Sequence, residues 1–437
     1  MPDKVIFFTV TTLITIGVVF SYSLTPFLMV RFSAGEFNFV LKQFIFSVMS
    51  IFIIWAVSRL NPDKWLFRIG MSMFLGGLFL MVIMNFLPSS IVPTIGGASR
   101  WISIFGFSIA PVEFFKIGFI YFISWSMARK IEVDSQHRFR SELLMFLPYL
   151  IIFIISVFFI TVLQKDLGQS VILGGTLILL SYLAGGSGKF IAKVIGFLTF
   201  VFLLFIVSFS HRTERIQSWW QLAKTWLPDW FSNMIGVQDG SEPYQVSQAL
   251  GSIYNGGFFG TGLGNGIFKY GFLAEVHTDF ILEGIAEELG IFAIMIIFML
   301  FIILFQRILK VANRSENKIY LLFNIGIALI IGLALLINTY GSTGLIPMKG
   351  IPVPFLSYGG SSMLALAFGI GMVLMTSKHA TQESDKPAKP ETSSPDSNKR
   401  NIQYENYPQH QPPPHQNQQP NNMNQNHNNN FRQRREF

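Results

Sequence analysis

The sequence predicts an all-α integral membrane protein with ten transmembrane helices, N- and C-termini in the cytoplasm, and a large extracellular loop between helices 7 and 8. Three observations predict this fold class: the composition, the spacing of charged residues, and the positions of Lys and Arg. Of the 437 residues, 51% are hydrophobic and only 13% are charged, whereas soluble domains contain about 25% charged residues. So few charges exclude a soluble enzyme, a secreted module and a disordered protein as descriptions of the whole chain.

Charge-free runs divide the chain into the expected spans, because a membrane helix needs ~20 mostly apolar residues. The ten apolar stretches are 5–30, 43–58, 69–99, 104–127, 143–164, 167–188, 194–211, 289–306, 319–348 and 350–377. The fourth is interrupted by Glu113 and Lys116. The first is too long for the apolar core of a signal peptide and lacks a small-residue cleavage site, so we expect it to persist as a helix.

The basic residues favour one orientation, because cytoplasmic loops are rich in Lys and Arg. A cytoplasmic N-terminus puts most loop cations on the inner side, and the even number of spans returns the C-terminus to the same side. These cations are Arg59, Lys64, Arg68, Arg129, Lys130, Arg138, Arg140, Lys189, Lys193, Arg307, Lys310, Arg314 and Lys318. Topology therefore explains much of the net charge of +8 without a nucleic-acid partner.

Two segments are not expected to span the membrane. The first is the outer loop, about 211–276, whose Trp residues favour the membrane interface; helical pieces are expected at 214–227 and 245–254. The second is the tail, 378–437, which is rich in Asn, Gln and Pro and is predicted to be disordered and cytoplasmic. The domain organisation is thus a polytopic membrane domain, 1–377, followed by this tail.

The chain lacks several common catalytic features. It contains no Cys, which excludes disulfides, thiolate metal sites and Cys nucleophiles. Walker, dinucleotide-binding, HExxH and GxSxG motifs are also missing, so nothing in the sequence indicates nucleotide use.

Charged residues in or beside the spans are candidates for function, because charges are costly at membrane depth. Glu113 and Lys116 stand three residues apart and therefore share one helix face. They form either an ion pair that orders the bundle or part of a site, and the two interpretations are compatible. Arg212 and Arg215 either clamp a phosphate, which the planar guanidinium matches, or anchor the outer loop at the interface.

The segment AEVHTDFILEGIAEELG, 274–290, concentrates titratable groups at the start of a span. If a helix begins near Thr278, Asp279 lies in its first turn and Glu283 and Glu287 follow on the same face, toward the bundle. Asp279 is also explained as an ordinary helix-capping residue. A stripe of carboxylates could instead hold a divalent cation, Mg or Mn, because such ions prefer oxygen ligands.

Two further polar segments lie between spans. Residues 164–169 are typical of a tight polar turn. Residues 341–362 contain so many Pro and Gly that a re-entrant or extended segment is expected, and such backbone is tolerated at membrane depth only where it lines a cavity or is buried in protein. Lys349 in this segment is a candidate for binding an anionic headgroup.

A series of blocks in fixed order resembles the SEDS family of bacterial cell-wall proteins, which serve shape, elongation, division and sporulation. The blocks are GASRWISIFGFSIAPVEFFK (97–116), LQKDLGQS (163–170), RTER (212–215), YQVSQALGSIYNGGFFGTGLG (244–264), HTDFILEGIAEELG (277–290) and PMKGIPVPFLSYGGSS (347–362). The likeness covers roughly residues 5–377. Lys349 before Gly350 is similar to the division-type FtsW group, and a sporulation member would look nearly the same. The chain departs from the family pattern in APVE at 110–113 and QKDLG at 164–168.

The resemblance implies an inverting peptidoglycan glycosyltransferase that polymerises lipid II at the outer face of the bacterial cytoplasmic membrane during cell division and releases undecaprenyl pyrophosphate. Asp279 would be the catalytic general base. The substrate-binding residues would be Glu113, Lys116, Arg212, Arg215, Gln248, His277 and Lys349. No cofactor is certain, and a divalent cation stays an open alternative.

The expected ligands and partners are lipid II, undecaprenyl-pyrophosphate-linked glycan, a class B penicillin-binding protein and other divisome membrane proteins at the division septum. Two other functions stay open: a lipid II flippase and a non-catalytic divisome scaffold. The concentration of acidic residues at one outer face favours the polymerase, because a flippase needs polar groups along its whole path.

Overall fold

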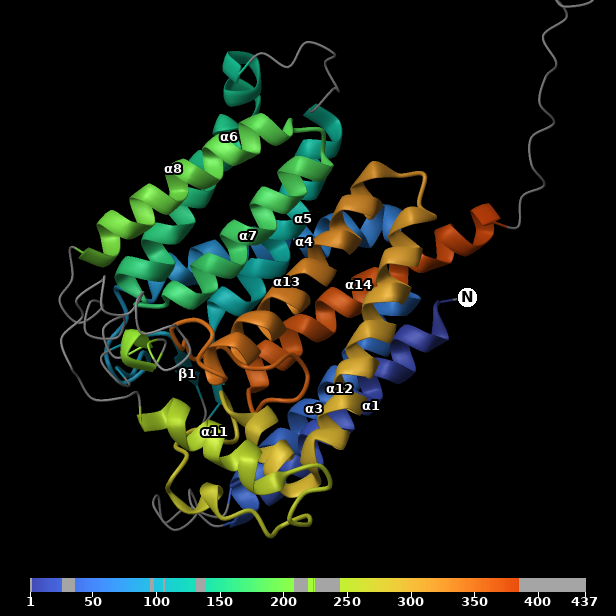
Figure 1. Ribbon diagram of the computed structural model, residues 1–437. Helices are drawn as coiled ribbons and strands as arrows, with labels where there is room; N and C mark the ends of the chain where they lie inside the picture. Colours follow the sequence, from blue (N-terminus) through green and yellow to red (C-terminus); the bar gives the residue numbers. More distant parts are fainter. Residues whose placement is uncertain are drawn as a thin grey trace, which may run out of the picture. The chain divides into compact units, whose positions relative to one another are not determined.

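Figure 1 shows the computed structural model of the chain. It describes residues 2–25, 36–94, 98–104, 107–130, 139–207, 219–222, 224 and 244–384. The chain divides into two compact units, Met1–Lys386 and Pro387–Phe437. The second unit, and with it nearly all of the predicted tail, lies outside the described residues, and the first unit is described below.

The described part of the first unit is helical apart from one short hairpin and the connecting segments. Its long helices are α1 (Lys4–Ser23), α3 (Glu36–Arg59), α4 (Pro62–Ile83), α5 (Pro111–Lys130), α6 (Phe139–Val157), α7 (Leu167–Leu183), α8 (Gly188–Val207), α12 (Ile281–Asn313), α13 (Lys318–Ser342) and α14 (Gly360–Ser384). The shorter elements are β1 (Ile102–Ile104), β2 (Phe107–Ile109), the π-helix η1 (Phe158–Leu163), α11 (Tyr244–Gly256) and the 3-10 helix η2 (Phe268–Tyr270).

Seven helices in the described ranges are long and apolar enough to cross a membrane. They are α1, α3, α4, α6 continued by η1, α12, α13 and α14. Helix α7 is apolar but shorter. Large apolar side chains such as Phe52, Phe79 and Met299 are exposed on these helices, as expected where lipid takes the place of water. The first unit is therefore a multi-pass membrane domain.

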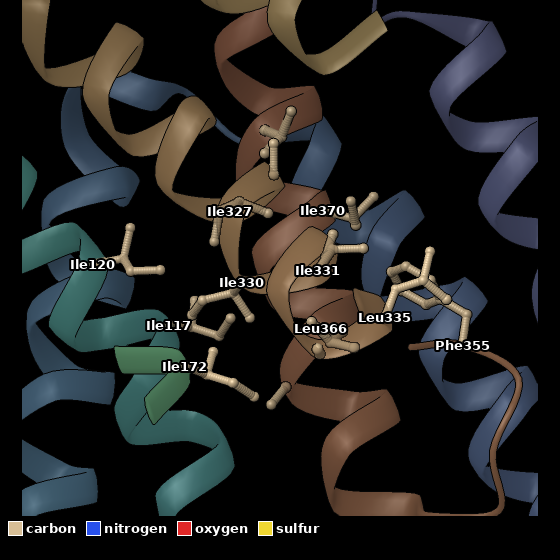
Figure 2. Packing of buried hydrophobic residues seen from close by; sticks show 14 of the residues in the cluster. Ile117, Ile120, Ile172, Ile327, Ile330, Ile331, Leu335, Phe355, Leu366 and Ile370 are labelled. Atoms are coloured by element: carbon tan, nitrogen blue, oxygen red, sulfur yellow. The ribbon is translucent and has the colours of Figure 1, made fainter. Parts of the chain in front are cut away.

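Helix α13 lies at the centre of the bundle, in contact with α5, α7, α12 and α14 (Figure 1). Figure 2 shows Ile327, Ile330, Ile331 and Leu335 of this helix meeting apolar side chains of α5, α7 and α14. These residues are almost fully buried. Because lipid is as apolar as these side chains, close van der Waals packing is what stabilises the contacts between the helices.

Several predicted spans begin at other residues than expected, and α4 and α5 show why. Helix α4 begins at Pro62, not after Arg68, because Asn61 caps it by accepting from the backbone N–H of Asp63 at 3.0 Å. The fourth span was expected from residue 104 and begins at Pro111 instead. The strands β1 and β2 ahead of it pair antiparallel, with Ile102 opposite Ile109. Pro suits the first helical position because its missing N–H would have no partner there.

Helix α12 differs from the prediction in its start and in its continuity. It begins at Ile281, so Asp279 lies in the preceding turn and not in the first helical turn. The helix is broken at Gly290, where φ is 78° and ψ is 177°, a conformation essentially restricted to glycine. A Cβ at Gly290 would also clash with the carbonyl of Phe258. Residues 281–289 therefore form a half-helix (the α12 half-helix) ahead of the long apolar part.

The outer loop is described only in part. Residues 211–218, 223 and 225–243 lie outside the described ranges, whereas 219–222 are helical, within the piece expected at 214–227. The helical piece expected at 245–254 is confirmed as α11, which packs against α12. The non-helical segment expected within 341–362 is also confirmed: the chain is irregular between the end of α13 and Gly360.

Candidate active site

Asp279 lies in a tight turn directly before the α12 half-helix. Its backbone N–H donates to the carbonyl of Glu275 at 3.0 Å, and Glu275 adopts a left-handed φ of 57°. The Asp279 carboxyl faces Gly350, where an added Cβ would lie 2.5 Å from Oδ2. Glycine at position 350 therefore leaves the space that this carboxyl occupies.

The surroundings of Asp279 oppose its ionisation. Burial, followed by the negative charges of Glu275 and Asp166, raises the pKa of this carboxyl from 3.8 to about 7, and Arg100 opposes the rise. A carboxyl with a pKa near the working pH is well suited to accept a proton in a reaction. Asp279 is thus a candidate general base.

The turn that carries Asp279 is attached to the irregular segment after α13. Ser357 Oγ donates to the carbonyl of Thr278 at 2.5 Å, and the backbone N–H of Tyr358 donates to the carbonyl of His277 at 2.9 Å. Two of the blocks found in the sequence, 277–290 and 347–362, therefore form one structural unit. The sequence order alone did not indicate this contact.

His277 is buried, and its ring lies beside Tyr358 with ring centroids 5.6 Å apart. Burial lowers the pKa of this imidazole from 6.5, and Glu275 opposes the decrease. Its Nε2 is 3.9 Å from Glu275 Oε2, whereas its Nδ1 has no hydrogen-bond partner. A neutral imidazole with an unpartnered ring nitrogen can form a hydrogen bond to a substrate hydroxyl.

Glu113 and Lys116 form the ion pair expected from their spacing, with 2.9 Å between Nζ and Oε2. Gln169 of α7 completes the group: Lys116 Nζ donates to its Oε1 at 2.6 Å, and its Nε2 donates to Glu113 Oε1 at 3.0 Å. All three residues are buried. They line a cavity of about 20 Å³ together with residues 351–354, which is room for about one water molecule.

The polar turn predicted at 164–169 is shorter than expected, because α7 begins at Leu167; the turn at 164–166 is held by Arg100. The guanidinium donates to the carbonyls of Gln164 and Lys165 at 3.2 and 2.8 Å, and it pairs with Asp166 at 3.6 Å. Burial raises the pKa of Asp166, and Arg100 opposes this rise. The turn thus supplies Asp166 to the surroundings of Asp279, and the first turn of α7 supplies Gln169 to the pair Glu113–Lys116. Sequence reasoning treated it only as a turn and missed Arg100 and Gln169.

The other predicted site residues are Lys349, Gln248, Arg212 and Arg215. Lys349 is partly buried directly before Gly350. Gln248 is partly buried on α11, the helix that packs against α12. Arg212 and Arg215 lie outside the described residues.

Glu287, the last carboxylate of the predicted stripe, and its neighbour Glu288 have structural partners. Glu287 accepts from Asn255 Nδ2 at 2.9 Å and from the backbone N–H of Ile267 at 2.7 Å. Glu288 pairs with Lys269 at 2.8 Å and accepts from Ser23 Oγ at 2.5 Å. Within the described ranges no three His, Asp or Glu side chains come together as a metal site. Glu287 and Glu288 therefore hold the fold, and the described part of the chain offers no carboxylate cluster that fits the divalent-cation alternative.

Comparisons with known proteins agree with the sequence blocks. The family model for cell cycle proteins of the FtsW, RodA and SpoVE type matches residues 3–382. A probable peptidoglycan glycosyltransferase FtsW from Helicobacter pylori (strain ATCC 700392 / 26695) is 41% identical over 382 residues, covering 86% of this chain and 98% of the relative. A protein of the same description from Geobacter metallireducens is 31% identical over 376 residues, covering 86% and 94%.

Solved structures share the fold at lower identity. One is described as "Structural coordination of polymerization and crosslinking by a peptidoglycan synthase complex"; its matching chain has a TM-score of 0.64 at 19% identity, covering 87% of this chain and 99% of that chain. The rod shape determining protein RodA from Thermus thermophilus matches with a TM-score of 0.57 at 18% identity, covering 86% and 97%. With the family model matching most of its length, the chain belongs to the family of cell cycle proteins that comprises FtsW, RodA and SpoVE.

Proposed function

We propose that the chain is a peptidoglycan glycosyltransferase that polymerises lipid II into glycan strands at the outer face of the bacterial cytoplasmic membrane during cell division. Two relatives that are 41% and 31% identical are described as probable peptidoglycan glycosyltransferases. The observation that carries the proposal is the Asp279 carboxyl, whose pKa of about 7 and position against Gly350 suit a general base.

The proposal includes a topology of ten spans with both termini in the cytoplasm and the loop 211–276 outside. The seven long apolar helices support it, together with three others, α5, α7 and α8. In α5, the pair Glu113–Lys116 is neutralised internally, which makes its insertion into a bilayer acceptable. The division into a membrane domain, 1–377, and a tail, 378–437, is part of the same proposal.

An outer location explains why the donor substrate must arrive already activated. Nucleotides are confined to the cytoplasm, whereas a sugar linked to undecaprenyl pyrophosphate carries its leaving group with it. In the proposed step, Asp279 accepts the proton of the 4-hydroxyl of the acceptor sugar, and that oxygen attacks the anomeric carbon of the growing strand. The new C–O bond forms with inversion as the bond to the pyrophosphate breaks.

A general base accounts for only part of the rate, typically 10²–10⁴-fold. The remainder requires positioning and stabilisation of the negative charge that develops on the departing pyrophosphate. We assign the charge stabilisation to Arg212, Arg215, Lys116 and Lys349. Glu113, Gln248 and His277 are proposed to hold the sugar and lipid headgroup.

The proposed partner is a class B penicillin-binding protein, with other divisome membrane proteins at the septum. A structure that shares this fold belongs to a peptidoglycan synthase complex in which polymerization and crosslinking are coordinated, which supports a partner of this kind. The bound ligands in this scheme are lipid II and undecaprenyl-pyrophosphate-linked glycan.

The test is glycan synthesis by the purified full-length protein with its transpeptidase partner in detergent. Given lipid II, the mixture is expected to form long glycan strands that are resolved by gel electrophoresis. In parallel, transport of lipid II is measured with the protein alone in vesicles that contain fluorescent lipid II. This control is needed because the intramembrane pair Glu113–Lys116 and the broken segment before α14 are also typical of a transport path. Translocation without polymer would favour the flippase, and neither activity would favour the scaffold.

A further inference from the structure

Asn338 of α13 connects the two segments that form the candidate active site. Its side chain is 2% exposed. The amide nitrogen donates to the carbonyl of Asp279 at 2.6 Å and to the carbonyl of Ile351 at 2.8 Å. A primary amide has two N–H groups, and here each of them holds a different segment.

The chemistry of the two partners fixes the orientation of this amide. Both acceptors are backbone carbonyl oxygens, so exchanging the amide N and O would bring three oxygens together without a proton between them. The other amide atom, Asn338 Oδ1, is buried without a hydrogen-bond partner. Burial of Oδ1 without a partner is unfavourable. The two hydrogen bonds that the amide nitrogen donates offset this cost and hold the side chain in its orientation.

Asn338 is one of three donors that hold consecutive carbonyls of the HTD segment. The carbonyl of His277 accepts from the Tyr358 N–H, that of Thr278 accepts from Ser357 Oγ, and that of Asp279 accepts from Asn338. Two of these donors lie in the irregular segment after α13. Asn338 alone of the three lies on a long helix, and this helix is at the centre of the bundle.

We infer that Asn338 is a positioning residue for the proposed reaction: by holding the Asp279 carbonyl and the Ile351 carbonyl together, it sets the distance between the Asp279 carboxyl and Gly350. This inference rests on the proposed function. It concerns the orientation of the base rather than contact with substrate, and a misplacement of about 1 Å in an active site reduces the rate by ~10²-fold. The loss is therefore expected in kcat, with lipid II binding largely retained.

The same helix supplies a matched control. Asn324 is also fully buried on α13, and its side chain accepts from Thr376 Oγ1 of α14 at 3.1 Å. The substitutions Asn338→Leu and Asn324→Leu therefore replace the same side chain by the same residue in the same helix. They differ in whether a contact to the Asp279 turn is removed.

The experiment measures kcat and KM for lipid II polymerisation, together with thermal unfolding, for wild type and both variants. Asn338→Leu is expected to lower kcat about 100-fold with KM within about 3-fold of wild type, and Asn324→Leu to keep kcat within about 3-fold. If Asn338→Leu does not fold, the isosteric Asn338→Asp replaces it. A protonated carboxyl has a single O–H to donate, so Asp at position 338 can hold only one of the two carbonyls. A loss of about 10-fold in kcat is therefore expected for this variant.

Two results would overturn the assignment. The first is a folded Asn338 variant whose kcat equals that of wild type. The second is an equal loss of kcat in the Asn338 and Asn324 variants that parallels their loss of stability. A wild-type protein that makes no glycan at all would instead contradict the proposed function itself, and the two failures are thus distinguishable.

Discussion

At the scale of single residues, Asp279 is set apart by an environment that disfavours its charge while leaving room for its carboxyl. Burial and the neighbouring Glu275 and Asp166 raise its pKa, and Gly350 leaves space beside Oδ2. Both features have measurable consequences.

The first consequence is a pH dependence of polymerisation. Asp279 acts as a base only when it is deprotonated, and its pKa is raised from 3.8 to about 7. The rate is therefore expected to fall as pH decreases through about 7 and to level off above about pH 8. Measurement of kcat at saturating lipid II from pH 5.5 to 8.5 tests this. A rate that stays constant down to pH 5.5 would exclude a base with this pKa.

The second consequence concerns Gly350. In Gly350→Ala the new methyl group would lie 2.5 Å from Asp279 Oδ2, so the carboxyl must move, and a loss of at least about 10-fold in kcat is expected. Gly76→Ala is the control, because a Cβ there meets nothing within 4 Å. Equal kcat values for the two variants would show that the carboxyl tolerates displacement.

The sequence made some of these residues recognisable and left others unrecognised. Glu113, Lys116 and Asp279 were found because charges are rare in an apolar chain. Asn338 and Gln169 are neutral residues within predicted spans, and their partners are distant in sequence. Their importance comes from contacts between segments, which no local pattern encodes.

At the scale of elements, the α12 half-helix is fixed to the loop before it by buried charge. Lys269 Nζ pairs with Glu288 and donates to the carbonyl of Gly264 at 2.7 Å. The side chains of Lys269 and Glu288 are 1% and 0% exposed. The segment between Lys269 and Asp279 is thus held at its start by this pair and at its end by Ser357 and Asn338.

Removal of Lys269 is expected to destabilise the protein strongly. Lys269→Met leaves the buried Glu288 without its cation, and breaking a buried ion pair in this way costs about 3–5 kcal/mol. Denaturant unfolding in detergent measures this loss. Lys310→Met, which replaces an exposed lysine near the end of α12, serves as the control. Equal stability of the two variants would contradict a structural role for the pair, whereas Lys269→Met combined with Glu288→Gln should recover part of the loss.

Element boundaries were predicted less well than the elements themselves. Charge-free runs locate a helix but not its first turn, because Lys64 and Arg68 lie within the first turns of α4. The hairpin ahead of α5 and the break at Gly290 are set by strand pairing and by contact with Phe258. Both are tertiary effects that override the apolar pattern.

At the scale of the whole molecule, the membrane domain gathers segments from most of the chain around α13. The sequence predicted a multi-pass helical protein and its family, because composition and motif order are properties of the whole chain. It did not predict that the blocks 277–290 and 347–362 interlock. That contact depends on the path of the chain in three dimensions.

The tail is predicted to be dispensable for catalysis. Helix α14 ends at Ser384, and the first compact unit ends at Lys386. Deletion of residues 387–437 is therefore expected to leave kcat for lipid II polymerisation within about 2-fold of the full-length value. A loss of 10-fold or more in the purified, folded protein would assign the tail a direct part in the reaction.

The central claim is that Asp279 is the base of a lipid II polymerase, and the most direct measurement compares glycan synthesis by wild type and Asp279→Asn. An Asn side chain keeps the shape but cannot accept the proton as a carboxylate does, so polymerisation is predicted to fall by about 10²–10⁴-fold. Thermal unfolding and lipid II binding should stay close to wild type. Glycan strands formed at the wild-type rate by the folded Asp279→Asn protein would contradict the account.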